Sequence, residues 1–447
     1  MLFSSIPFLF YFLPVTLLVY YLAPEKCKNF ILLIASLIFY GWGEPRFVFA
    51  LLGATILGFL FGLLIGKFEG TKWSLVFLLL SVTSSVGLLL YFKLGTFFPI
   101  GVSFYTFQLL SYTIDVYRKE VKPQKNFVIL ATYVSMFPQL IAGPIVRYQD
   151  IEMQLFSRKL HFSNISEGIR RFVLGLGKKV LIANALGELC EIFRASNEKS
   201  VAFFWLYAVS FMLHIYFDFS GYSDMAIGLG KMLGFDFLEN FNYPYISGSI
   251  AEFWRRWHIS LGSWFRDYVY IPLGGNRVSK ARWIFNIAVV WFLTGFWHGA
   301  AWNFIVWGMM FAVLLLLEKL VYGEWLKKSK VFSHAYVLLM VLLSFVIFNA
   351  TDLREAADYI AAMFGFGAYP LISDEFVFYL KNFGMLLLVG TIGATPLPAR
   401  LMGWMKGRAS LEKGVNLLEI SGLLVLFVLV TAYLVDGSFN PFLYFRF

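Results

Sequence analysis

The longest uncharged stretch of the chain runs from Trp283 to Leu317 and reads WIFNIAVVWFLTGFWHGAAWNFIVWGMMFAVLLLL. These 35 consecutive residues include no Asp, Glu, Lys or Arg. A single helix of this length would measure about 52 Å, whereas the hydrocarbon core of a bilayer is about 30 Å thick. We therefore expect the stretch to lie in a membrane and to break, bend or cross it twice. Gly295 and Gly299, on either side of His298, permit close backbone approach or a local break there.

The composition of the whole chain agrees with a membrane location. Hydrophobic residues make up 59% of the chain and charged residues only 14%, against about 25% charged residues in a soluble domain. The net charge of +10 is expected in cytoplasmic loops, and no basic stripe indicates a nucleic-acid partner. The two cysteines, Cys27 and Cys190, show neither metal-ligand spacing nor a disulfide framework.

Other charge-free stretches of about 20 residues predict further spanning helices, because backbone groups in lipid must be satisfied within their own segment. The longer ones are Phe3–Leu22, Phe47–Gly66, Trp73–Phe92, Leu94–Ile114 and Asn126–Val146. Shorter candidates are Asn29–Gly43, Val201–Phe217, Ala335–Thr351, Asn382–Ala399 and Ser421–Val435. We expect a single membrane-embedded domain over residues 1–447.

The orientation follows from the basic residues of the short loops. Positive charges gather after the first, third and fifth candidate spans, at Lys26 and Lys28, Lys67 and Lys72, and Arg118, Lys119, Lys122 and Lys125. Since cytoplasmic loops carry the excess of Lys and Arg, the N-terminus is expected outside the cytoplasm. The first span has no basic residue before it and no small-residue cleavage site after it, so it is expected to be retained.

Two stretches do not have the composition of simple spans. Residues 147–200 mix charges with apolar patches, which is typical of interfacial amphipathic helices. Residues 236–282 contain Asp, Asn, Pro and Arg among many aromatic residues. Such a segment is tolerated at membrane depth only where protein or a water-filled cavity surrounds it, so we expect a re-entrant or interfacial element.

Two histidines are the strongest candidates for chemistry. His298 lies in the middle of the charge-free stretch, where an ionisable side chain is costly and indicates a functional site. If residues 252–265 are helical, His258 shares one face with Trp254, Leu261 and Phe265 and projects from an aromatic surface. His214 is better explained by a structural hydrogen bond to a carbonyl.

Several alternatives remain open on these residues. Asp218 and Asp224 would suit the ion relay of a transporter or polysaccharide exporter, or a hydrogen-bonded structural role. His214 and His298 would suit haem ligation if their helices face one another, and a scaffold for an envelope synthase complex is a further interpretation. A phosphate-binding Gly-Lys-Ser/Thr loop and an HExxH zinc pattern are absent from the sequence.

Several sequence blocks, in order, resemble the membrane-bound O-acyltransferase superfamily, and within it the membrane subunits of bacterial alginate O-acetyltransferases. The Phe253–Gly275 stretch and the Phe296-Trp297-His298-Gly299 block carry the resemblance most specifically. The other blocks are Phe39–Arg46, Phe137–Ile145, Asp218–Asp224, Glu239–Tyr245 and Asn440–Phe447. The D-alanyl transferases of teichoic acid synthesis share the tryptophan-histidine block, so the acceptor polymer stays open.

The resemblance implies an all-α polytopic bundle of about eleven transmembrane helices with re-entrant helices around a central tunnel or funnel. It assigns catalysis to His298 and a second active-site position to His258. Candidate substrate-binding residues are Trp297, Arg266, Asp267, Asn242 and Asp218. The expected reaction is attack of a hydroxyl on an acyl thioester, with a histidine as general base because its pKa lies near neutrality.

The expected co-substrate is acetyl-CoA or another acyl thioester, with no bound cofactor and no metal. The expected acceptor is an extracytoplasmic polysaccharide such as alginate, reached with the help of extracytoplasmic acetyltransferase partner proteins. The chain itself is expected to be a multi-pass protein of the bacterial inner membrane.

Overall fold

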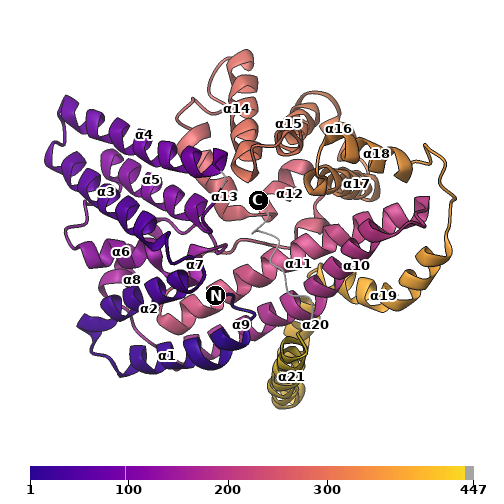
Figure 1. The fold of residues 1–447 in the computed structure, drawn as a ribbon, viewed down its shortest axis with the longest axis horizontal. Helices are drawn as coiled ribbons and strands as arrows, with labels where there is room; N and C mark the ends of the chain where they lie inside the picture. Colours follow the sequence, from indigo (N-terminus) through magenta and orange to yellow (C-terminus); the bar gives the residue numbers. More distant parts are fainter. Residues whose placement is uncertain (96, 438–447) are drawn as a thin grey trace. The chain divides into compact units, whose positions relative to one another are not determined.

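A computed structural model describes residues 1–95 and 97–437, and all of its regular elements are helices (Figure 1). The Asn440–Phe447 block quoted for the resemblance lies outside these residues. Two compact units are formed, one by Met1–Val173 with Tyr222–Glu239 and the other by Leu174–Gly221 with Asn240–Phe447. Helices α9 (Phe162–Gly177) and α11 (Val201–Leu233) each contribute residues to both units. The single domain expected from the sequence stays a prediction.

Within the described chain, seven helices are long and apolar enough to cross a membrane, which makes this a multi-pass membrane protein. They are Val48–Lys67, Lys72–Leu94, Val201–Leu233, Trp302–Leu326, Lys330–Asn349, Asp374–Gly393 and Ser410–Val435. The expected number of about eleven is larger partly because α2 (Lys28–Gly43) and α5 (Val102–Arg118) have only 16 and 17 residues. The Phe8–Leu22 stretch is a further, shorter apolar helix.

The first unit is built around a bundle of α3, α4 and α5, with α2 packed on α6 (Figure 1). Its α3 approaches α5 closely, since a Cβ on Gly58 would lie 2.6 Å from the Leu109 side chain. Its elements are η1 (Phe8–Phe12), α1 (Leu13–Leu22), η2 (Glu25–Cys27), α2, α3 (Val48–Lys67), α4 (Lys72–Leu94), α5, α6 (Phe127–Ser135), α7 (Phe137–Leu140) and α8 (Tyr148–Phe156).

The prediction of one span over Leu94–Ile114 is wrong, because α4 ends at Leu94 and α5 begins at Val102. Gly101 between them has φ +81°, and a Cβ there would lie 2.6 Å from the carbonyl oxygen of Leu140. Glycine adopts this left-handed conformation without the usual steric cost. The turn therefore delays the start of α5 to Val102, eight residues into the apolar run.

The prediction of one span over Asn126–Val146 is also wrong. Helix α6 ends at Ser135, and Met136 adopts φ −50° and ψ 114° before the short α7. Pro138 occupies the first turn of α7, where its missing N–H costs no helical hydrogen bond. The apolar run is thus divided into two short helices.

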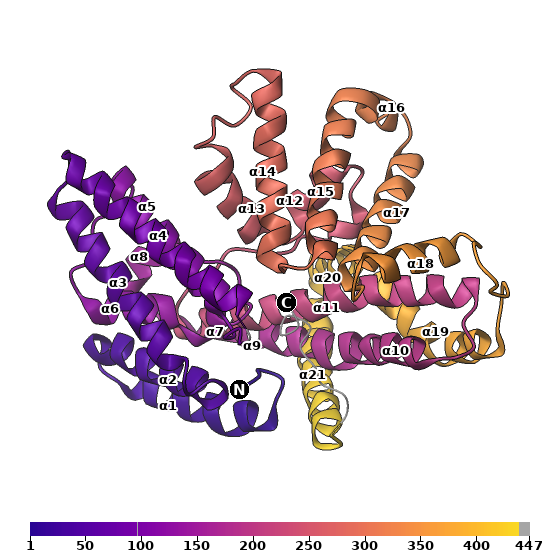
Figure 2. The ribbon, with the colours of Figure 1, turned by 45° about the horizontal axis from the view of Figure 1, so that its top comes forward.

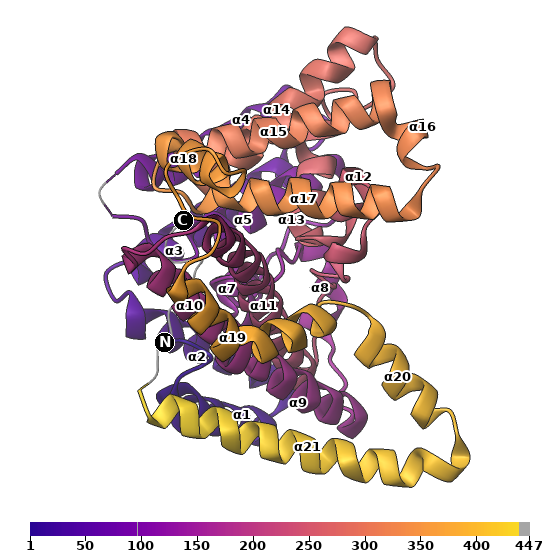
Figure 3. The same cartoon turned by 90° about the vertical axis from the view of Figure 1, so that its right-hand side faces the viewer.

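The second unit holds α14 (Lys280–His298), α15 (Trp302–Leu317) and α17 (Lys330–Asn349), which lie side by side (Figure 2). Helix α19 (Asp374–Gly393) leads through α20 (Leu397–Lys406) into the long α21 (Ala409–Val435), as Figure 3 shows. The remaining elements are η3 (Lys178–Ala183), α10 (Asn184–Ala195), η4 (Pro244–Ile246), α12 (Ile250–Arg256), α13 (Ile259–Phe265), η5 (Arg266–Tyr270), η6 (Glu318–Tyr322), α16 (Gly323–Leu326) and α18 (Leu353–Met363).

The two stretches that were not expected to be simple spans contain short helices instead. Residues 147–200 form α8, α9, η3 and α10, and α10 alternates buried Leu186, Leu189 and Phe193 with more exposed polar residues. Residues 236–282 form short helices and turns in which Asn240, Ser247 and Ser260 are buried. Protein therefore surrounds these polar side chains, whereas Asp236, Arg255 and Arg266 of the same segment are exposed.

Candidate active site

The candidate site lies at the tip of the hairpin formed by α14 and α15. Helix α14 ends at His298 and α15 begins at Trp302, so the predicted break in the apolar stretch is confirmed. The two helices approach closely: a Cβ on Gly295 would lie 2.4 Å from the carbonyl oxygen of Phe304. A Cβ on Gly308 would lie 2.4 Å from the carbonyl oxygen of Trp291. The hairpin thus requires glycine on both helices.

Aromatic rings surround the imidazole of His298. The ring centroid of His298 lies 4.8 Å from Trp297, 5.0 Å from Trp307 and 5.3 Å from Phe348. The interplanar angles are 82°, 84° and 81°, so all three contacts are edge-to-face. His298 is 8% exposed, so the ring is largely shielded but not completely enclosed.

His258 lies between two short helices and not within one. Helix α12 ends at Arg256, α13 begins at Ile259, and His258 has φ 43° and ψ 55° in the left-handed region. The continuous helix considered for residues 252–265 is therefore wrong. The predicted aromatic surroundings of His258 are nevertheless present, because its ring lies 4.7 Å from Phe219 and 6.1 Å from Trp297.

Asn240 fixes the tautomer of His258. Its Oδ1 lies 3.2 Å from His258 Nδ1 and also accepts hydrogen bonds from the backbone N–H and the hydroxyl of Ser260. A carbonyl oxygen only accepts, so Nδ1 carries the proton and Nε2 carries a lone pair. Nε2 is buried without a hydrogen-bond partner among the described residues. The side chain thus presents a free acceptor.

Burial also keeps this second histidine neutral. His258 is 1% exposed, and loss of hydration lowers its pKa to about 3. The charged form is disfavoured because transfer of an ion out of water is costly. At neutral pH the Nε2 atom therefore remains unprotonated.

The structure brings His258, Trp297 and His298 together, since Trp297 contacts both imidazole rings. Asp218 has a different environment: its carboxylate pairs with Lys179 at 2.5 Å, and both side chains are 2% exposed. The next residue, Phe219, packs on His258. The predicted contact of Asp218 with substrate stays a prediction.

The remaining candidate binding residues are held by other partners. Arg266 and Asp267 form a bidentate pair, with Nε–Oδ1 and Nη2–Oδ2 distances of 2.6 and 3.0 Å. The Arg266 side chain is 61% exposed. Asn242 is exposed, and its backbone N–H and carbonyl bind Arg256. Their roles in substrate binding stay predictions.

The other buried histidine has the structural contact expected of it. His214 Nδ1 lies 2.7 Å from the carbonyl oxygen of Ala183. A Cβ on Gly187 would lie 2.8 Å from the His214 ring, so the imidazole also fills space against α10. These contacts fix the ring between η3 and α11.

Three residues of the site, Asn240, Trp307 and Phe348, were not predicted from the sequence. Asn240 was visible inside the Glu239–Tyr245 block, but its acceptor role depends on the turn that brings it to His258. Trp307 and Phe348 are apolar residues on spanning helices, and only the packing of those helices identifies them as walls of the site. Within the described part of the chain, no group of three or more His, Cys, Asp or Glu side chains is placed to hold a metal ion.

The site therefore combines two imidazoles, one of them neutral, in an aromatic shell at the tip of a membrane-embedded hairpin. Residues 118–354 match the family described as MBOAT, membrane-bound O-acyltransferase family. The chain belongs to this family and is an O-acyltransferase.

Relatives that match over nearly the whole chain are acetyltransferases by name. “Probable alginate O-acetylase AlgI” of Pseudomonas putida is 37% identical, with 100% of both chains covered. The protein with the same description in Azotobacter vinelandii is 36% identical, again over 100% of both chains. “Peptidoglycan O-acetyltransferase” of Helicobacter pylori is 31% identical over 88% of this chain and 85% of the relative.

Proposed function

We propose that this O-acyltransferase moves an acetyl group from a cytoplasmic thioester, acetyl-CoA, toward hydroxyls of an extracytoplasmic polysaccharide such as alginate. The observation that carries the proposal is the buried imidazole of His298 at the hairpin tip, within the part of the chain that matches the family. The names of the relatives that cover the whole chain support the acetyl group and the alginate acceptor.

The chemical step uses His298 as general base. A hydroxyl oxygen attacks the thioester carbonyl carbon, and the His298 imidazole accepts the hydroxyl proton. A C–O bond forms, the C–S bond breaks, and the proton passes from the imidazole to the leaving thiolate. The products are an O-acetyl ester and a free thiol, so His298 returns to its neutral form.

His258 orients the acceptor in this mechanism. A role at the oxyanion would require a ring N–H directed at the thioester oxygen, but the Nδ1 proton of His258 is donated to Asn240. The Nε2 lone pair suits a hydrogen bond from a second, non-reacting hydroxyl of the sugar, since the proton of the attacking hydroxyl goes to His298. Trp297 lies against both rings and would exclude water, which limits hydrolysis of the donor.

We assign the protein to the bacterial inner membrane with its N-terminus outside the cytoplasm. The basic residues that follow Phe3–Leu22, and those at and after the ends of α3 and α5, support this orientation. The acetyl donor is then met on the cytoplasmic face and the polymer on the other face. In the cell, extracytoplasmic acetyltransferase proteins would bring the intact polymer to the site, whereas a short oligosaccharide would reach it unaided.

A transporter was the alternative from another class, and the family assignment excludes it. The two carboxylates that suggested a transporter also form ion pairs, Asp218 with Lys179 and Asp224 with Arg171. Transfer to another envelope polymer, or transfer of D-alanine, remains the alternative within the family. The name of the Helicobacter relative favours acetyl transfer to peptidoglycan as the second candidate.

The test uses the full chain in nanodiscs with acetyl-labelled acetyl-CoA and alginate oligosaccharide. His298→Ala should abolish transfer of label and release of CoA while the protein stays folded, because the hydroxyl loses its base. His161→Ala is the matched control, since His161 is exposed between α8 and α9. Wild-type turnover in His298→Ala would remove His298 from the mechanism. Label on peptidoglycan fragments instead of alginate would favour the second candidate.

A further inference from the structure

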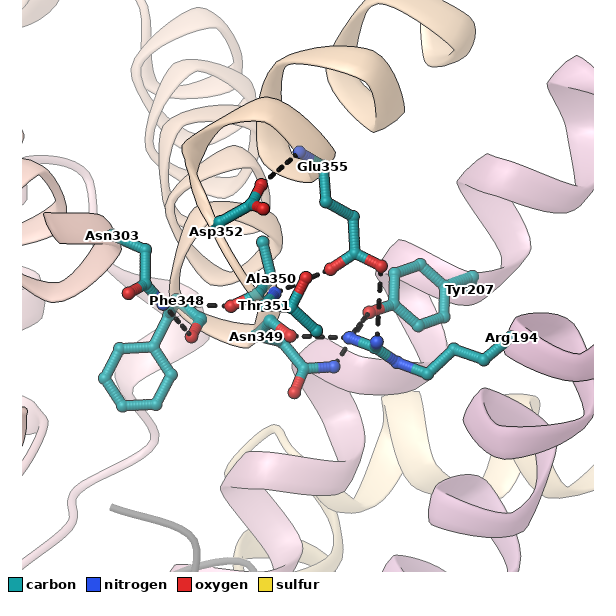
Figure 4. A network of polar contacts seen from close by, with 9 residues as sticks. All are labelled: Arg194, Tyr207, Asn303, Phe348, Asn349, Ala350, Thr351, Asp352 and Glu355. Carbon is teal, nitrogen blue, oxygen red and sulfur yellow. Dashed lines mark hydrogen bonds and ion pairs between the residues drawn. The ribbon is translucent and has the colours of Figure 1, made fainter. Parts of the chain in front are cut away.

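The last turn of α17 is held by side chains from two other helices (Figure 4). Final carbonyls of a helix have no donor within the helix. Asn303 Nδ2 donates to the carbonyl oxygens of Phe348 at 3.3 Å and Ala350 at 2.9 Å. Arg194 Nη2 donates to the carbonyl oxygen of Asn349 at 2.5 Å. Three successive carbonyls thus receive side-chain donors.

The guanidinium of Arg194 is itself fixed from several directions. Its Nη2 donates to the Tyr207 hydroxyl at 3.2 Å, and the Asn349 amide donates to the same hydroxyl at 2.8 Å. Its Nη1 lies 3.4 Å from Glu355 Oε1, while Glu355 Oε2 accepts the backbone N–H of Thr351 at 2.6 Å. A cation is favourable at the negative end of a helix, so this network holds the turn electrostatically as well as sterically.

The held turn presents one wall of the candidate active site. Phe348 lies 5.3 Å from the His298 ring and 5.1 Å from Trp307. Phe348 is 3% exposed and is the α17 residue among the three rings around the imidazole. A shift of the last turn would therefore move the surface against which His298 rests.

Asn303 connects this wall to the hairpin tip. It lies in the first turn of α15, five residues after His298, and is 2% exposed. Its amide spans from the hairpin to the end of α17, so the same side chain constrains the helix after His298 and the ring opposite it.

We propose that Asn303 and Arg194 are positioning residues for His298, acting through the last turn of α17 and the ring of Phe348. The proposal rests on the proposed role of His298 as general base. Neither side chain needs to touch a reacting atom, because each acts by fixing the carbonyls of residues 348–350. Misplacement of a catalytic group by about 1 Å can cost on the order of 100-fold in rate.

The test measures kcat, KM for acetyl-CoA and the pH dependence of kcat for the full chain in nanodiscs, with alginate oligosaccharide as acceptor. Asn303→Asp keeps the size of the side chain but removes both donors, and Arg194→Gln removes the cation. Each should lower kcat by about 10- to 100-fold and shift the apparent pKa seen in kcat, with a small change in KM. Arg194→Lys, which keeps the charge, should retain more turnover than Arg194→Gln.

The double variant provides a second readout. Because both residues act on one turn, Asn303→Asp with Arg194→Gln should lower kcat by less than the product of the single effects. Independent, multiplicative losses would contradict action through a shared turn.

Arg171→Gln is the matched control. Arg171 is 21% exposed, close to the 22% of Arg194, and pairs with Asp224 and Glu239 within the other unit. It should lower thermal stability and leave the pH profile of kcat unchanged. The inference is overturned if the Asn303 and Arg194 variants behave like this control or like wild type. If His298→Ala is inactive in that case, only the inference fails; if His298→Ala is active, the proposed function fails as well.

Discussion

His258 combines a backbone conformation and an electrostatic environment that are both unfavourable for its residue type. A non-glycine residue in the left-handed region costs on the order of 1–3 kcal/mol and persists only where its surroundings enforce it. Asn240 and Ser260 provide that enforcement on one side, and Phe219 does so on the other. Strain of this kind gathers at functional sites, which agrees with the role proposed for His258.

The lowered pKa of His258 predicts a pH dependence of stability. The folded protein binds this proton only near pH 3, whereas an unfolded histidine titrates near 6.5. Below about pH 6.5 the unfolded chain therefore binds more protons, and the free energy of unfolding should fall by up to about 1.4 kcal/mol per pH unit. Thermal unfolding in nanodiscs at pH 7 and pH 5 measures this loss.

His258→Asn should remove most of that acid sensitivity, because asparagine tolerates the left-handed region and does not titrate. His161→Asn serves as the exposed control and should keep the wild-type difference between the two pH values. An equal acid-induced drop in His258→Asn and wild type would assign the sensitivity to other groups.

Among the residues of the site, the two histidines could be predicted from the sequence, but the residues that contact them could not. An ionisable side chain in an apolar stretch is visible without coordinates. The contact of Phe348 with His298 joins residues on different helices, and nothing in the composition near residue 348 distinguishes that phenylalanine from its apolar neighbours. Contacts of this kind depend on how spanning helices pack, which the local pattern does not encode.

The hairpin of α14 and α15 depends on its glycines. A Cβ on Gly308 would lie 2.4 Å from the Trp291 carbonyl oxygen and 3.1 Å from the Gly295 Cα, and both are backbone atoms. Gly308→Ala should therefore force the helices apart at a cost of about 1–3 kcal/mol. We expect a lower unfolding temperature and a fall in turnover, because His298 lies at the tip of the same hairpin.

Gly384→Ala is the control for this substitution. Gly384 lies within α19, and a Cβ there meets nothing within 4 Å. Since alanine is the better helix former, this variant should be as stable as wild type or slightly more stable. Equal behaviour of the two alanine variants would contradict the tight packing of the hairpin.

A break in an apolar run could be predicted only where the run is too long to cross the bilayer once as a single helix. The stretch from Trp283 to Leu317 is too long for one crossing, so its division at His298 followed from the bilayer thickness. The runs at Leu94–Ile114 and Asn126–Val146 have the length of a single span, and the absence of charge in them gives no sign that Gly101 or Pro138 lies at a break. The turn residues, and not the hydropathy pattern, set the bounds of the helices in these two runs.

The orientation of the whole molecule is testable through its two cysteines. Cys27 is exposed in the loop between α1 and α2, whereas Cys190 is buried. If the N-terminus is extracytoplasmic, that loop is cytoplasmic, and a membrane-impermeant maleimide should label Cys27 only in permeabilised spheroplasts. Cys27→Ser should abolish the labelling, with Cys190 as the internal unreactive thiol. Labelling of intact spheroplasts would invert the proposed topology.

The division of the chain into units has a consequence for biosynthesis. The first unit takes Tyr222–Glu239 from beyond an intervening segment of the second unit. Arg171 is therefore synthesised before Asp224 and Glu239, the two carboxylates with which its guanidinium pairs. Translation of the intervening segment takes several seconds at about 5–20 residues per second. A translational pause or premature stop in this interval leaves a cationic side chain without its carboxylates. Insertases and membrane proteases would meet the nascent protein in that state.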